Sequence, residues 1–74
     1  MSRLPTLRSR QVIAALKKAG FSERRQIGSH LILQHSDGRE VVVPVHAKTM
    51  KRGTMLGILK QAKLTQRQFR GYLK

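Results

Sequence analysis

Histidine is the side chain best suited to acid–base chemistry near neutral pH, and this sequence contains three: His30, His35 and His46. His30 directly follows Gly28 and Ser29, in a chain with 16 Lys and Arg but only 3 Asp and Glu. Surrounding cations disfavour a charged imidazolium, so a neutral ring is expected in so basic a chain. A neutral imidazole can accept the proton of a ribose 2′-hydroxyl, whose oxygen then attacks the adjacent phosphorus. We therefore expect His30 to be an acid–base group that cleaves RNA without a metal.

The residues around these histidines suggest supporting roles. Gly28 allows a backbone conformation that brings amide donors close to a phosphate, and Ser29 can donate a hydrogen bond to a phosphate oxygen. His46 follows the last predicted strand and is our candidate for the general acid. His35 lies on the other face of its strand from His30, before a turn, and is expected to be exposed. The alternative is that Gly-Ser is only a turn and His30 only a polar strand residue.

A second group of basic residues, Lys48, Lys51 and Arg52, precedes and begins the second predicted helix. Free amides and the positive end of the helix dipole attract phosphate there, and adjacent cations strengthen that attraction. We therefore expect this patch to bind RNA. A zinc site built from the histidines is not expected, because the carboxylates that usually orient histidine ligands are scarce. No other cofactor is indicated.

The composition limits the class of protein. A net charge of +13 in 74 residues is typical of proteins that bind nucleic acid. The length predicts one domain over residues 1–74. No apolar run approaches the roughly 20 residues that span a bilayer, and no stretch of signal-peptide type begins the chain. The absence of cysteine is compatible with a reducing compartment, so we expect a cytoplasmic protein without membrane contact.

Periodicity and turn signals predict an α+β fold. We expect a helix at 10–19, strands at 23–27, 30–35 and 40–43, a helix at 51–62 and a short C-terminal helix at 66–73. Ser9 is expected to cap the first helix, and Asp37-Gly38 to form a type I′ turn. Residues 1–8 are predicted to be an arm whose Arg3 and Arg8 contact phosphate. Packing both long helices on one face of a three-stranded antiparallel sheet gives the layout of a double-stranded-RNA-binding domain.

Four motifs spanning about residues 10–64 resemble the HicA toxin family: Ala19-Gly20-Phe21, Gly28-Ser29-His30, Val43-Pro44-Val45-His46, and Gly53-Thr54 followed by Ile58-Leu59-Lys60-Gln61-Ala62. The resemblance implies a fold similar to the double-stranded-RNA-binding domain, ribosome-independent mRNA cleavage, and neutralisation by a HicB-type antitoxin. It also implies that His30 is catalytic, because the histidine of the Gly-Ser-His motif has that role in the family. The family does not assign the second proton carrier, so His46 stays a separate hypothesis. Lys63 departs from the family pattern, which usually has glycine there.

The partner and the alternatives follow from the charge. An acidic antitoxin is expected to cover His30 and the patch from Lys48 to Arg52, whereas a homo-oligomer is not expected. A non-catalytic RNA-binding or ribosome-associated module would need the basic surface but not His30. A DNA-binding regulator fits less well, because three strands separate the helices that would form a helix-turn-helix.

Overall fold

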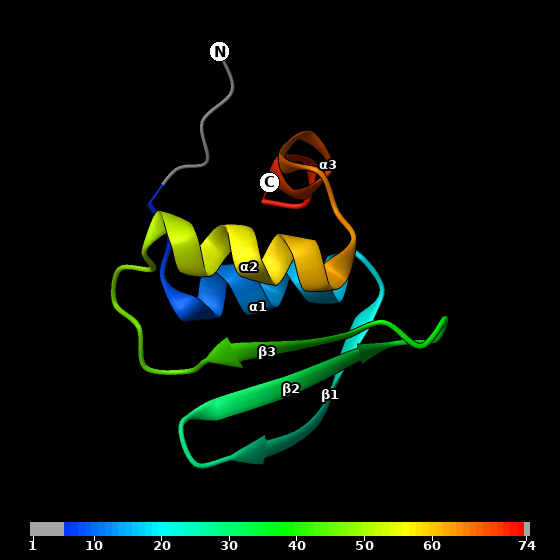
Figure 1. The fold of residues 1–74 in the computed structure, drawn as a ribbon, viewed down its shortest axis with the longest axis horizontal. Helices are drawn as coiled ribbons and strands as arrows, with labels where there is room; N and C mark the ends of the chain where they lie inside the picture. The colour runs from blue at the N-terminus through cyan, green and yellow to red at the C-terminus, as the bar shows by residue number, and fades with distance from the viewer. Residues whose placement is uncertain (1–5, 74) are drawn as a thin grey trace.

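The computed structural model describes residues 6–73, in which helices cover one face of a small sheet (Figure 1). The elements are α1 (Ser9–Lys18), β1 (Phe21–Ile27), β2 (His30–His35), β3 (Glu40–Pro44), α2 (Arg52–Ala62) and α3 (Gln66–Gly71). The predicted α+β fold and its element order are confirmed. The element ends differ slightly from the prediction, most clearly where β1 begins at Phe21 rather than at residue 23.

The sheet is antiparallel with strand order β1-β2-β3, so each strand pairs with its neighbour in sequence. Side chains alternate between its two faces. Leu31 and Leu33 of β2, together with Val41 and Val43 of β3, are buried against the helices. Figure 1 shows α1 and α2 side by side on this face, while no helix of residues 6–73 covers the other face. The predicted one-sided packing is confirmed, and we call the uncovered face the open face.

Helix α1 buries Val12, Ala15 and Leu16, whose spacing places them on one side of the helix. The helix ends before Gly20, whose φ of +104° lies in the region that favours glycine. A Cβ atom at Gly20 would also lie 2.7 Å from Nε2 of His35. Glycine therefore allows both the helix exit and the close approach of the β2 end.

Ser9 does not cap α1, contrary to the sequence prediction. The N-cap is Arg8, and Ser9 is the first helical residue with only 2% of its surface exposed. Its hydroxyl donates to the carbonyl of Pro44 and accepts from the amide of Ala47 (3.1 Å), whose carbonyl accepts from the Ser9 amide (3.0 Å). Ser9 therefore ties the start of α1 to the exit of β3, a role that depends on contacts far apart in sequence.

The two hairpins use glycine differently. Gly28 and Ser29 form a two-residue loop in which only Gly28 has positive φ (+57°), as a type II′ turn requires. The second loop is three residues long, and Gly38 (φ +98°) alone has positive φ, so the predicted type I′ turn at Asp37-Gly38 is wrong. Arg39 instead donates from Nε to the Asp37 carboxylate (2.8 Å), and this hydrogen bond lowers the pKa of that carboxyl.

Helix α2 packs Met55, Ile58 and Leu59 into the core. Its Gln61 side chain accepts a hydrogen bond from the Val42 amide (3.1 Å), so it occupies part of the outer edge of β3. The helix ends at Lys63, which adopts the left-handed conformation (φ 55°, ψ 42°). This is the position at which the sequence carries lysine where the resemblance leads us to expect glycine.

Replacing Lys63 with glycine is expected to stabilise the fold. Left-handed backbone costs an L-residue about 1–2 kcal/mol, and the greater freedom of glycine in the unfolded chain offsets part of that gain. We expect a net increase of about 0.5–1 kcal/mol in the free energy of unfolding, measured by urea denaturation. The control is Lys60→Gly inside α2, which should cost about 1 kcal/mol. Destabilisation by both substitutions would contradict a strained Lys63.

Helix α3 and the chain before α1 complete the core. The Thr65 hydroxyl accepts from the Gln68 amide (3.0 Å), and the Gln68 side chain accepts from the Thr65 amide (2.9 Å), so the two residues form a capping box at the start of α3. Phe69 is fully buried. Leu7, within the segment predicted to be an arm, is buried and its carbonyl accepts from the Met50 amide (2.8 Å). Arg3 lies outside the described residues.

Candidate active site and phosphate-binding surface

One end of the fold gathers the residues that the sequence singled out. Figure 1 shows that the β1–β2 turn, the exit of β3 and the starts of α1 and α2 all lie there. The Val45 amide donates to the Ser29 carbonyl (2.8 Å), so the segment after β3 is fastened to the turn. Ser9 fastens the same segment to α1. Elements far apart in sequence thus form one surface.

His30 is the first residue of β2, and its side chain is exposed. Its strand partners are Ile27 and Pro44, so these three residues share the open face. The turn before it is held by the Gln26 side chain, whose Nε2 donates to the Gly28 carbonyl (3.0 Å). An exposed imidazole on a fastened turn is accessible to a large substrate such as a nucleic-acid strand.

Ser29 and Gly28 leave donors available beside His30. Among residues 6–73 the Ser29 hydroxyl has no protein hydrogen-bond partner, and Ser29 is exposed. Apart from its two chain neighbours, no described residue has an atom within 4 Å of the position that a Cβ would take at Gly28, so this side of the turn is open. A phosphate can approach both residues without displacing other side chains. The roles predicted for Gly28 and Ser29 stay predictions.

Arg25 is a candidate that the sequence reasoning missed. A β-bulge between Glu23 and Arg25 shifts the register, so that Arg25 pairs with Ile32 and lies diagonally to His30 on the open face. Arg24, the extra residue, instead donates to the Gln34 side chain (2.8 Å). Arg25 is exposed and forms no ion pair in the described part of the chain. No sequence signal distinguishes the two arginines, because the bulge alone decides which one pairs with Ile32 and so lies diagonally to His30.

His46 lies in a different setting from His30. It lines a hollow of about 240 Å³ together with Arg8, Ser9, Arg10, Val45, Ala47 and Lys48. The strand partner of His30 is Pro44, two residues before His46. Across residues 6–73 no hydrogen bond joins the two imidazoles. His46 as general acid therefore stays a hypothesis that needs the substrate strand to bridge both groups.

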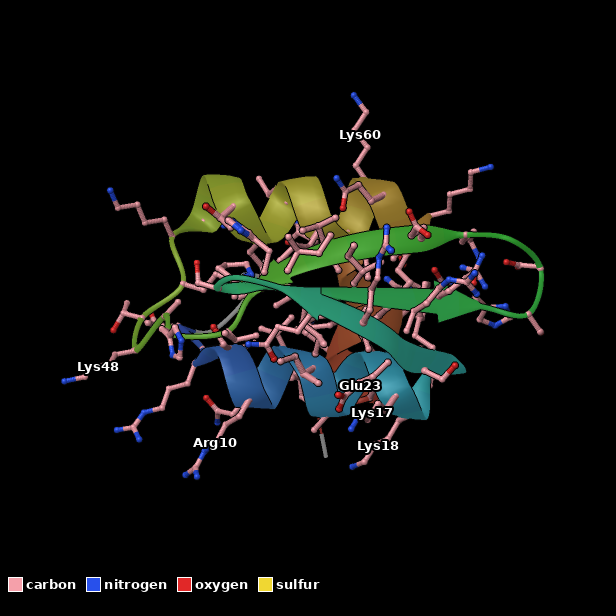
Figure 2. All side chains as sticks on the ribbon, turned by 90° about the horizontal axis from the view of Figure 1, so that it is seen from below. Arg10, Lys17, Lys18, Glu23, Lys48 and Lys60 are labelled. Atoms are coloured by element: carbon pink, nitrogen blue, oxygen red, sulfur yellow. The ribbon has the colours of Figure 1, made fainter. Side chains whose placement is uncertain are left out.

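The predicted Lys48, Lys51 and Arg52 patch divides into two parts. Lys48 lines the hollow, and Figure 2 shows it projecting from the same end of the molecule as Arg10. Lys51 is the N-cap of α2, and Arg52 begins that helix with no acidic residue in its first turn. The positive end of the α2 dipole is therefore not neutralised by a side chain of the helix itself. Both parts are positively charged and exposed.

His35 is less exposed than the sequence predicts. It is half-buried, with its ring edge-to-face against Phe21 at 5.2 Å between centroids. Its Nδ1 accepts a hydrogen bond from the Asp37 amide (3.1 Å). These contacts explain the burial, because they hold the ring against Phe21 and close to Gly20. Within residues 6–73, no three His, Asp or Glu side chains converge as metal ligands, and no helix is long and apolar enough to cross a bilayer.

Comparison with protein families shows the family to which the chain belongs. The family described as the HicA toxin of bacterial toxin–antitoxin systems matches residues 9–64. The chain belongs to the HicA toxin family. The resemblance of its four motifs is thereby confirmed, and membership implies an antitoxin partner. No curated protein matches the sequence. The HicA match ends before α3, although Phe69 of that helix belongs to the core.

Proposed function

We propose that this HicA-family toxin is an endoribonuclease that cleaves mRNA, with His30 as its acid–base group. The observation that carries the proposal is the exposed imidazole of His30 at the fastened β1–β2 turn, on a strongly cationic surface. Membership of a toxin family supports it, because degradation of transcripts is a direct route to toxicity. We place the activity in the cytoplasm, where transcripts are translated.

The reaction needs no external nucleophile. His30 accepts the 2′-hydroxyl proton, the 2′-oxygen bonds to the adjacent phosphorus, and the bond from phosphorus to the 5′-oxygen breaks. The leaving 5′-oxygen takes a proton from a general acid, for which His46 is the candidate. The products are a 2′,3′-cyclic phosphate and a 5′-hydroxyl. Arg25 and the donors at Gly28 and Ser29 are suited to stabilise negative charge as it develops on the phosphorane.

The antitoxin partner is proposed to be an acidic, HicB-type protein that covers His30. The open face beside His30 carries an apolar row in which Ile27 is 55% exposed and Val42 is 38% exposed. Arg24 and Arg25 border this row, so an acidic partner can bury the apolar side chains and pair with the arginines. A complex that leaves His30 and this row open to solvent would contradict the proposal.

Cleavage in the presence of a chelator tests the catalytic proposal. Labelled single-stranded RNA incubated with the protein and EDTA is expected to give fragments with 2′,3′-cyclic phosphate ends, identified by mass spectrometry. Single-stranded DNA of the same sequence should stay intact, because it lacks the 2′-hydroxyl. Fragments with 5′-phosphate ends, or cleavage of the DNA, would exclude this mechanism.

The alternative is a non-catalytic RNA-binding or ribosome-associated module. The cationic hollow and the start of α2 favour it, since both can bind phosphate without His30. It predicts RNA binding that weakens steeply with salt but yields no product. The same incubation therefore separates the two functions, provided that binding is measured alongside it.

A further inference from the structure

We infer that the hollow between α1 and the segment after β3 binds a second backbone phosphate of the RNA strand, next to the phosphate that His30 attacks. The identification of this strand as a substrate depends on the proposed function. The binding site itself depends only on the geometry and charge of the hollow. We call it the flanking-phosphate hollow, lined by Arg8, Ser9, Arg10, Val45, His46, Ala47 and Lys48.

The walls of the flanking-phosphate hollow are held in place by buried contacts. Ser9, at its floor, is 2% exposed and hydrogen bonds to both Pro44 and Ala47. A second pair of backbone atoms, the Ser9 amide and the Ala47 carbonyl, closes the same junction at 3.0 Å. The Cα positions of Arg8, Arg10 and His46 are therefore fixed relative to one another. Because the backbone is already ordered, binding of an anion needs to order only the cationic side chains, which limits the loss of conformational entropy.

Within the described residues, no acidic side chain neutralises the positive charge of the hollow. Arg8, Arg10 and Lys48 are exposed cations, and none of them forms an ion pair among residues 6–73. The acidic side chains in that range lie elsewhere. Glu23 pairs with Lys17 on the other half of α1 (2.5 Å), Asp37 pairs with Arg39, and Glu40 begins β3. The three cations around one hollow repel one another, and an anion relieves that repulsion.

The position of the hollow selects a phosphate of the same strand rather than a separate anion. Pro44 is the strand partner of His30, and the Val45 amide is bonded to the Ser29 carbonyl. His46 follows directly, so the hollow begins where the His30 turn ends. An RNA strand that crosses His30 towards α1 reaches the hollow with a neighbouring phosphate. Arginine suits this contact because its planar fork matches two phosphate oxygens.

The test uses two substrates, a ribodinucleotide with one phosphodiester and a single-stranded hexaribonucleotide. Each is assayed with the wild type, Arg10→Gln, Lys48→Gln and the double variant. For the double variant we expect the ratio of kcat/KM on the hexamer to kcat/KM on the dinucleotide to fall at least about tenfold, since one charged hydrogen bond has that worth. The loss should appear in KM. The matched control is Lys60→Gln, because Lys60 projects from α2 away from the hollow (Figure 2).

A binding measurement keeps this inference separate from catalysis. A hexamer with 2′-O-methyl groups cannot be cleaved, so its affinity can be measured for every variant across a salt series. The slope of log affinity against log salt should decrease by about 0.7 for each phosphate that the hollow variants no longer bind, and stay constant in Lys60→Gln. The salt slopes of the hollow variants can still differ from that of Lys60→Gln when neither the wild type nor any variant cleaves RNA. That result would support phosphate binding in the hollow and contradict the proposed catalysis.

Three results would overturn the inference. One is an unchanged hexamer-to-dinucleotide ratio together with an unchanged salt slope in the double variant. Another is an equal loss in Lys60→Gln, which would indicate general attraction by the net charge. The third is intact RNA binding with weakened binding of an acidic antitoxin, which would make the hollow a protein interface. Arg10 and Lys48 are exposed, so the fold of these variants is expected to persist, and circular dichroism checks it.

Discussion

Replacing His30 with alanine is expected to lower the rate of RNA cleavage by roughly 10²–10⁴-fold, the usual contribution of a general acid–base group. The side chain is exposed and lies beside a turn, so its removal leaves no cavity in the core. Affinity for RNA should stay close to that of the wild type, because the Lys and Arg side chains supply most of the attraction. The measurement is single-turnover cleavage of labelled RNA, with affinity determined on the uncleavable 2′-O-methyl strand.

Two further variants identify the reason for the loss. His30→Gln keeps a polar side chain without a group that titrates near neutral pH, so it should lose as much activity as His30→Ala. Ser22→Ala changes a small exposed side chain at the far end of the same face and should cleave like the wild type. Cleavage by His30→Ala within a few-fold of wild type would leave the imidazole without a catalytic role. An equal loss in Ser22→Ala would point to damage of the sheet.

Replacing Phe69 with alanine is expected to unfold most of the protein. Phe69 is the largest of the fully buried side chains, and truncation of a buried phenylalanine typically costs about 3–5 kcal/mol. A single core in a chain of this length supplies roughly 3–5 kcal/mol in total. The loss therefore matches the whole stability. Thermal melting followed by circular dichroism should show no cooperative transition, or one shifted to much lower temperature.

The matched control lies on the same short helix. Arg67→Ala removes an exposed side chain of α3, and its effect should stay within about 0.5 kcal/mol. The pair separates burial from helix formation, because alanine favours helix at both positions. A Phe69→Ala protein that melts like the wild type would show that α3 contributes little to the core. The prediction matters because α3 lies beyond residues 9–64, the part that matches the HicA family.

The element order could be predicted from the sequence because its signals are local. Runs of β-branched and aliphatic residues mark β2 and β3, and the spacing of Val12, Ala15 and Leu16 marks α1. Gly20 follows the end of α1 and Gly28 follows the end of β1. Each allows a turn that involves only a few neighbouring residues. The Gly-Ser-His motif likewise singled out His30, which the structure places on an exposed strand start.

The residues that come together in the site could be identified only from the tertiary structure. Ser9 reads as a helix cap in sequence, but contacts with Pro44 and Ala47, more than thirty residues away, bury it instead. A bulge of one residue decides that Arg25, and not Arg24, pairs with Ile32 beside His30. The hollow joins residues 8–10 to residues 45–48, two segments that all three strands separate in the sequence. Sequence patterns report the short-range preferences of the backbone, whereas register and packing between distant segments depend on the energy of the complete fold.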